Sequence, residues 1–171
     1  MTAAGPSGAT WSACRSRNRT VPRPWSLVWS TVPEKLQKVI DLFQMFDPAD
    51  RTDMLLSYAD QFKQVPREVA TRPFDKSHQV PQCESDAYAW AVKRPDGTLQ
   101  LYFAVENPSG VSAKALAAIL DKTLSGLPAS EIATITPAIV EQIFRQNISM
   151  GKGMGLMSMV QAVATLAKAA I

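Results

Sequence analysis

The chain has 171 residues, 46% of them hydrophobic and 19% charged, and a formal net charge of +3. This composition predicts one globular domain with additional chain and excludes a wholly disordered protein. No apolar run approaches the roughly 20 residues of a membrane-spanning helix, and one histidine with two cysteines cannot supply a four-ligand zinc site.

The positive charge is concentrated at the N-terminus. Residues 1–33 contain four arginines and no acidic residue, whereas 34–171 contain 14 Lys or Arg against 15 Asp or Glu. Prolines, serines and threonines without apolar periodicity predict a disordered basic tail over 1–31 and a folded domain over 32–171. The tail has the composition of an organellar transit peptide or of a weak polyanion-binding segment. We favour a third interpretation, an unstructured extension such as a start-site artefact.

Two helices are predicted first. Thr31 and Glu34 have capping-box spacing, and apolar residues follow at helical intervals up to Phe46. Asp47 and Pro48 are suited to the cap and first position of a second helix. The polar, proline-containing stretch 67–86 then has no periodicity and is predicted to be a loop.

A β-hairpin and further helices complete the domain. Large and small residues alternate over 88–92 and 99–105 around the turn sequence 94–97, which indicates two antiparallel strands. Apolar stripes then predict a helix from Val111 to near Gly126, another after Thr136, and a final helix after a glycine-rich turn at 151–155. The predicted fold class is α+β, a small antiparallel sheet with helices packed on one face.

Cys83 is the candidate reactive residue. It is the only cysteine of the folded part, and its neighbours are polar rather than the apolar residues that usually surround a structural cysteine. His78 and Ser85 could donate hydrogen bonds to its thiolate, whereas the nearby acids Glu84 and Asp86 disfavour that form. A reactive thiol and an incidental one remain alternatives from the residues alone.

Several segments resemble one known family. Val80–Ser85, with His78 before it and an aromatic-containing strand after it, is similar to the cysteine loop of the SufE family of cysteine desulfuration proteins. The matching segments run in one order over about 32–170; they are Pro33–Gln37, Leu55–Asp60, Leu124–Pro128 and the Gly155-Leu156-x-x-Met159 motif. The chain departs from the family at three places, where Glu84 replaces a usual Gln, Asp86-Ala87-Tyr88 replaces Gln-Val-Trp, and Lys152 matches a common arginine.

The resemblance implies a SufE/IscU-like fold and a sulfur-transfer function. Cys83 would accept persulfide sulfur from a pyridoxal-phosphate-dependent cysteine desulfurase, of the SufS or CsdA kind, stimulate that enzyme, and deliver the sulfur to an iron–sulfur scaffold complex. His78, Ser85 and Lys152 are possible supporting residues, although Lys152 lacks the bidentate fork of an arginine. Pyridoxal phosphate would belong to the partner, so no cofactor or metal of the chain's own is expected. The implied location is the bacterial cytoplasm, or a plastid or other organelle if the tail is a transit peptide.

Two other functions remain as alternatives. The protein could be an adaptor that docks on a desulfurase or another partner without transferring sulfur, with Cys83 merely tolerated. The other alternative is a single-cysteine thiol peroxidase, which is disfavoured because the cysteine segment Val80–Ser85 contains no arginine. The slightly acidic domain has no basic stripe, so a nucleic-acid partner is not expected, nor is a membrane.

Overall fold

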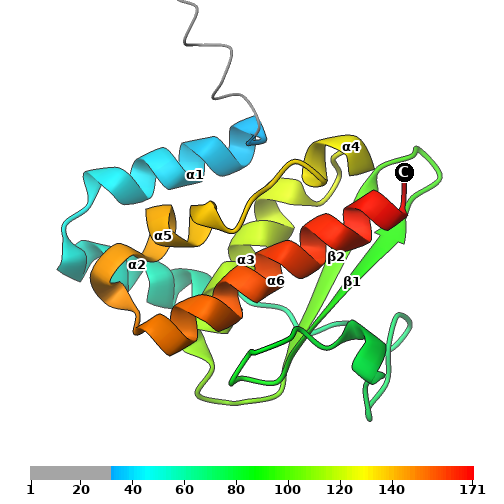
Figure 1. The fold of residues 1–171 in the computed structure, drawn as a ribbon, viewed down its shortest axis with the longest axis horizontal. Coiled ribbons are helices and arrows are strands. Elements are labelled where there is room, and N and C mark those ends of the chain that lie inside the picture. Colours follow the sequence, from blue (N-terminus) through cyan, green and yellow to red (C-terminus); the bar gives the residue numbers. More distant parts are fainter. Residues whose placement is uncertain (1–31) are drawn as a thin grey trace, which may run out of the picture.

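The computed structural model describes residues 32–171, and the predicted tail over 1–31 lies outside these residues. The described part has six α-helices, two short 3-10 helices and two strands (Figure 1). In chain order they are α1 (Glu34–Met45), α2 (Pro48–Asp60), η1 (Lys76–His78), β1 (Ala87–Lys93), β2 (Leu99–Val105), α3 (Val111–Leu124), α4 (Ala129–Ile132), α5 (Ala138–Phe144), η2 (Arg145–Asn147) and α6 (Met150–Ala169). This arrangement confirms the predicted α+β class.

The two first helices begin differently. Asp47 caps α2 as predicted, because its carboxylate accepts hydrogen bonds from the backbone N–H groups of Ala49 and Asp50. Helix α1 begins at Glu34 with Pro33 in the N-cap position and no side-chain cap. The predicted capping box would have placed the N-cap at Thr31, whereas the observed N-cap is Pro33. Thr31 itself lies outside the described residues.

The strands form an antiparallel hairpin whose register pairs Ala87 with Val105 and Lys93 with Leu99. Its turn contains Gly97 at φ 83°, which glycine adopts without steric cost. Side chains alternate between the two faces of the hairpin, and each face has buried residues. The helix face packs against α3 and α6 and presents residues 87 and 89 of β1 and 99, 101, 103 and 105 of β2.

The opposite face of the hairpin, here called the aromatic face, is covered by the segment between α2 and β1. Trp90 and Ala104 are buried there with Val65, and the half-buried Phe74 and Tyr88 pack around them. The ring of Phe74 lies 5.3 Å from that of Trp90 in an edge-to-face arrangement. The predicted loop over 67–86 is thus irregular apart from η1, and part of it shields this face from solvent.

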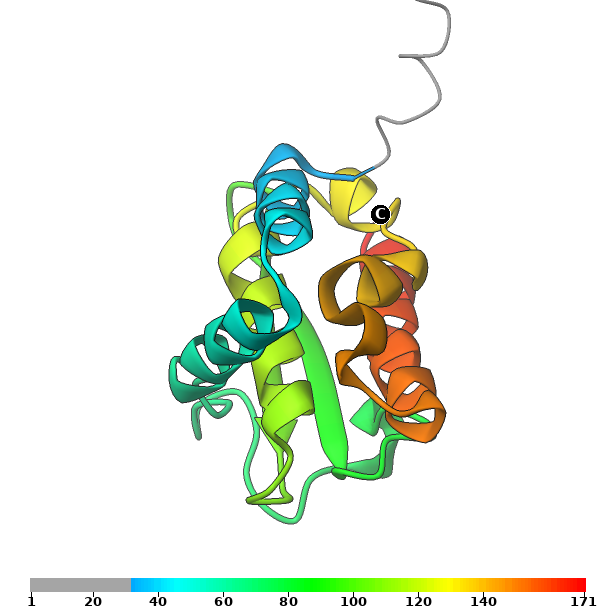
Figure 2. The same cartoon turned by 90° about the vertical axis from the view of Figure 1, so that its left-hand side faces the viewer.

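The helices form two groups beside the hairpin. Helices α1 and α2 pack against α3, and α5 packs against α6, so that α3 and α6 lie next to each other over the sheet (Figure 2). The largest fully buried side chains, including Phe43 and Phe144, join these groups into one core. No helix among residues 32–171 is long and apolar enough to cross a membrane.

One sequence prediction in this region is wrong. Residues 151–155 form the first turns of α6 rather than a turn that precedes it. Glycine disfavours a helix because it loses the most backbone entropy. Here Gly153 and Gly155 are both buried, against Ile148 and against the Cys83 loop, and this packing keeps their segment helical.

Candidate functional site

Cys83 lies in a short loop that closes one end of the hairpin ladder. Before the loop, the backbone N–H of Val80 donates to the carbonyl of Ala87 at 2.8 Å, and Gln79 forms a β-bridge with Tyr88. Residues 81–86, which we call the Cys83 loop, therefore connect two residues, Val80 and Ala87, that are hydrogen-bonded to each other. The loop turns with two non-glycine residues in the left-handed region, Gln82 at φ 58° and Asp86 at φ 45°. Such residues are uncommon there and persist where surrounding contacts hold them.

Three backbone hydrogen bonds hold the loop in this conformation. The N–H of Asp86 donates to the carbonyl of Cys83 at 3.2 Å and tightens the turn. The N–H groups of Glu106 and Asn107, which follow β2, donate to the carbonyls of Asp86 and Ser85. The loop is thus attached to the segment that connects β2 to α3.

The thiol-bearing residue borders a cavity. Cys83 is half-buried and packs against the main hydrophobic core. The adjoining cavity of about 360 Å³ is lined from three sides, by the Cys83 loop, by the start of α3 and by the start of α6. The structure thereby brings together three of the four residues predicted for the site, namely Cys83, Ser85 and Lys152.

His78 lies apart from this group. Its Nδ1 is 3.3 Å from the carbonyl oxygen of Ala89, a hydrogen bond that requires the proton on Nδ1. Its ring stacks on Trp90, with 5.3 Å between centroids and 30° between planes. His78 is therefore packed on the aromatic face, and it is not among the residues that line the cavity beside Cys83.

The short helix that carries His78 has an acidic cap. The carboxylate of Asp75 accepts a hydrogen bond from the backbone N–H of Ser77 at 2.7 Å. The backbone and hydroxyl groups of Ser77, with a smaller contribution from His78, hold the pKa of the exposed Asp75 below its usual value. This cap fixes η1, and with it the direction from which His78 approaches Trp90.

Opposing charges surround the cavity. Exposed Lys152 contributes a cation, and exposed Glu84 contributes a carboxylate. Helix α3 begins at the cavity with Gly110 as an N-cap that has no side-chain cap, so that the positive end of its dipole lies beside the cavity. An anion in the cavity would be favoured by α3 and Lys152 and disfavoured by Glu84.

The start of α3 is the part of the site that the sequence analysis missed. Gly110, Val111, Ser112 and Ala113 all line the cavity. Their sequence signal was the Ser109-Gly110 pair, which immediately precedes an apolar helical stripe. A helix start can be read from such a pair, but its position opposite Cys83 follows from tertiary packing.

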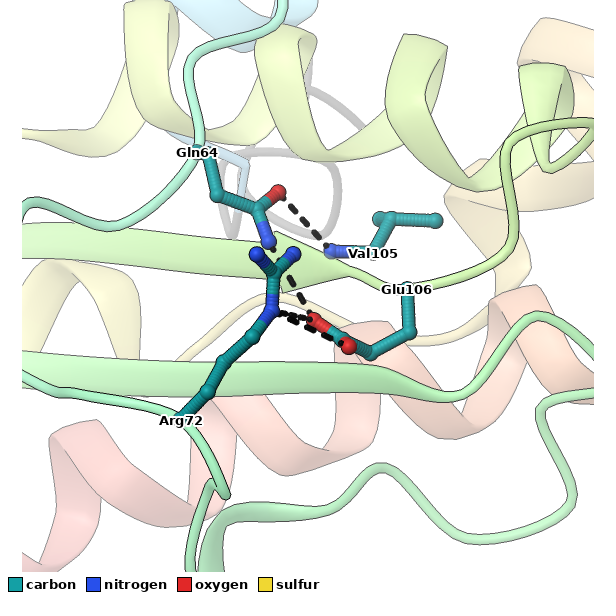
Figure 3. A network of polar contacts seen from close by, with 4 residues as sticks. All are labelled: Gln64, Arg72, Val105 and Glu106. Carbon is teal, nitrogen blue, oxygen red and sulfur yellow. Dashed lines mark hydrogen bonds and ion pairs between the residues drawn. The ribbon is translucent and has the colours of Figure 1, made fainter.

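A polar network supports the base of the loop from the other side (Figure 3). Arg72 Nε lies 3.0 Å and 3.2 Å from the two carboxylate oxygens of Glu106. Gln64 accepts from the N–H of Val105 at 3.3 Å and donates to Glu106 at 3.5 Å. These side chains connect the segment over the aromatic face to Glu106, whose backbone N–H holds Asp86.

The arrangement gives a partly shielded thiol with space beside its loop. Among residues 32–171, no three His, Cys, Asp or Glu side chains gather closely enough to hold a metal ion. The structure provides a half-buried thiol beside a cavity that the start of α3 and Lys152 also line, and a thiol acts as a nucleophile in its thiolate form.

Comparisons with known proteins found a matching family model and a similar relative. A family model described as SufE, an Fe-S metabolism associated domain, matches residues 37–167. SufE-like protein 1, chloroplastic/mitochondrial, from Arabidopsis thaliana is 30% identical over 132 residues, which are 76% of this chain and 34% of that relative. The chain therefore spans about a third of the relative's length.

A solved structure has a similar fold. The solution structure of a hypothetical protein from Thermus thermophilus matches with a TM-score of 0.64 and 23% sequence identity, covering 81% of this chain and 97% of that one. At this identity the likeness concerns the fold.

Proposed function

The chain belongs to the SufE family, and from this premise we propose that it accepts sulfur on Cys83 from a pyridoxal-phosphate-dependent cysteine desulfurase. It stimulates that enzyme and delivers the sulfur for iron–sulfur cluster assembly. The observation that carries the proposal is the half-buried thiol at a cavity that also receives the start of α3 and Lys152.

The transfer is a thiol–disulfide-type exchange. The Cys83 thiolate attacks the outer sulfur of a persulfide on the desulfurase's cysteine, and a new S–S bond forms on Cys83 as the old one breaks. The desulfurase's cysteine leaves as a thiolate, so no external oxidant or reductant is needed. One cysteine on the acceptor is sufficient, and Cys83 is the only cysteine of residues 32–171. A second thiol nearby would release the sulfur by closing a disulfide.

The cavity suits both anionic states of this reaction. The thiolate and the persulfide each carry negative charge, which the start of α3 and Lys152 favour. Glu84 opposes that charge, and because Glu84 and Lys152 are both exposed, water screens the two side chains alike. The balance supports sulfur acceptance at Cys83 without a histidine base, consistent with the position of His78 on Trp90.

Docking of the desulfurase would use the loop and the start of α6. Large apolar side chains are exposed at the starts of α6 and α3: Met150 at 86% and Met154 at 50% in α6, and Val111 at 38% in α3. Methionine is suited to adaptable protein contacts because its side chain is flexible and polarizable. In the free protein the loop lies inward, and we expect it to open on docking, so that hydrogen exchange in residues 76–86 changes when the desulfurase is added.

Intact mass after incubation with a desulfurase and cysteine tests the proposal. We expect a gain of one sulfur atom in the wild type, its loss in Cys83→Ser, and its retention in Cys14→Ser, the matched control on the other cysteine. No gain, with stimulation of the enzyme retained in Cys83→Ser, would establish the adaptor instead. Oxidation of Cys83 by peroxide, with no sulfur gained from the desulfurase, would establish the peroxidase.

A further inference from the structure

Three glycines occupy the first turns of α6, and one of them has a special environment. An ideal Cβ on Gly155 would lie 2.9 Å from the carbonyl oxygen of Gln82 and 3.1 Å from the Cα of Cys83. The other two, Gly151 and Gly153, would place a Cβ no closer than 3.4 Å to the end of a side chain. Gly155 is thus the one glycine of α6 at which a side chain would collide with the backbone of the Cys83 loop.

The contact cannot be relieved by a side-chain rotation. The three nearest neighbours of the ideal Cβ on Gly155 are all backbone atoms of the loop, and Gly155 itself is inside a regular helix. A methyl group there would force the loop away from α6, because α6 is anchored in the core by Leu156 and Met159. The loop is the part that can yield, since its residues 81, 82, 84 and 86 are exposed.

A second glycine contacts the same loop from α3. An ideal Cβ on Gly110 would lie 2.9 Å from Ser85 Oγ and 2.9 Å from Val105 Cγ1. Gly110 has φ −74°, so an alanine is compatible with its backbone. Its contacts are side-chain atoms, and a methyl group at this position would displace the loop less than one at Gly155.

The loop is held in a costly conformation. Gln82 and Asp86 both have positive φ, and three backbone hydrogen bonds compensate. The same loop is the one that we expect to open when the desulfurase docks.

We propose that Gly155, assisted by Gly110, is a positioning residue for Cys83, whose missing side chain lets the loop lie inward and sets the balance between a sheltered and an exposed thiol. The functional meaning of that balance rests on the proposed sulfur transfer. A sheltered thiol would protect a bound sulfur from solvent thiols, and an exposed one would exchange it with a partner. Glycine lowers helix propensity at position 155, but the packed Cys83 loop leaves no room for a side chain there.

The test is the rate at which iodoacetamide alkylates Cys83, measured in a Cys14→Ser background without any desulfurase. We expect Gly155→Ala to raise the rate about ten-fold, since overpacking of this kind shifts a local equilibrium by about that factor. Gly153→Ala is the matched control in the same helix, and we expect it to stay within about two-fold of the parent because its Cβ meets only the end of Ile148. Equal rates in Gly155→Ala and Gly153→Ala would overturn the proposal.

Hydrogen exchange separates loop displacement from a general loss of stability. In Gly155→Ala the amides of Asp86, Glu106 and Asn107 should exchange faster, because all three bonds define the inward loop, while amides in the middle of α3 should not change. Faster exchange throughout α3 as well would assign the effect to global unfolding and contradict a positioning role. If Gly155→Ala does not fold, Gly110→Ala carries the test, with a rise of about three-fold expected and an unchanged rate as the contradicting result.

The result is independent of the sulfur-transfer proposal, because alkylation needs no desulfurase. Faster alkylation in Gly155→Ala without any sulfur gain in the wild type would leave the positioning role intact and remove the proposed function. Sulfur gain in the wild type, together with equal alkylation rates in Gly155→Ala and Gly153→Ala, would support the proposed function and remove the positioning role.

Discussion

The two faces of the hairpin are packed by different means, and Cys83 and His78 belong to different sides although only four residues separate them in the sequence. On the helix face, alanines 87 and 89 let α3 and α6 approach closely, and the Cys83 loop lies over the starts of these two helices. On the aromatic face, Phe74, Tyr88 and Trp90 form a ring cluster onto which His78 stacks. Proximity in the sequence was therefore a poor guide to which residues surround the thiol.

The two faces of the hairpin therefore differ in their expected roles. The helix face provides the helix starts that line the cavity, the helix dipole and the close contact at Gly155, all from residues that follow Cys83 by more than 25 positions. The segment that covers the aromatic face also supports the base of the Cys83 loop, because its Arg72 binds Glu106. The chemistry is expected on the first face, and only structural support on the second.

Core substitutions should give the largest effect and should distinguish the faces by stability. Leu116 of α3 is fully buried on the helix side, and Leu116→Ala should lower the free energy of unfolding by about 3 kcal/mol through lost burial and a cavity. Phe74 is only half-buried, so Phe74→Ala should cost about 1–2 kcal/mol. Urea denaturation measures both, and an equal or reversed order would contradict the assignment of the main core to the helix face.

His78→Ala should lower stability and leave the chemistry in place. Loss of the stacking on Trp90 should cost about 1 kcal/mol. The initial rate of sulfur gain from a desulfurase should stay within about two-fold of the wild type, because the ring faces Trp90 rather than the cavity. A loss of ten-fold or more with the fold intact would show that His78 acts on Cys83 and would break the separation of the two faces.

Lys152 should have a modest effect of its own on the thiol. Lys152→Ala should slow sulfur acceptance about three-fold, because an exposed cation contributes little in water. Lys152→Arg should retain the wild-type rate, since the charge is kept. Rate measurements at low and high salt check this, and the difference between Lys152→Ala and the wild type should shrink as salt is added. A rate in Lys152→Ala equal to the wild type at low salt would remove this residue from the site.

The smallest effect is expected at Asp75, as a change of stability with pH. Hydrogen bonds from Ser77 lower the pKa of Asp75 in the folded protein, so its contribution is present above the unfolded value near 3.8 and is lost as the pH falls through the lower folded value. Asp75→Asn cannot titrate. The difference in unfolding free energy between wild type and Asp75→Asn should therefore decrease as the pH is lowered below 3.8, and a difference that grows would contradict the role of this cap.

The sequence predicts those parts of the fold that depend on short-range patterns. The cap at Asp47 and the alternation of the hairpin are local signals, and each gave the observed element. The start of α6 was missed because glycine disfavours helices, and the compensating contact of Gly155 with Gln82 joins residues 73 positions apart. The position of His78 was missed for a similar reason, since the pairing of Gln79 with Tyr88 places the preceding ring beside Trp90.

The central claim is that Cys83, seated on the helix face, is the residue that receives sulfur. A persulfide-loaded desulfurase, freed of cysteine, is mixed with the Cys14→Ser protein, and the peptide that contains Cys83 is analysed by mass spectrometry. We expect this peptide to gain one sulfur atom, a subsequent thiol reductant to remove it, and the corresponding peptide of Cys83→Ser to gain none. Sulfur that stays on the desulfurase, with the Cys83 peptide unmodified, would contradict it.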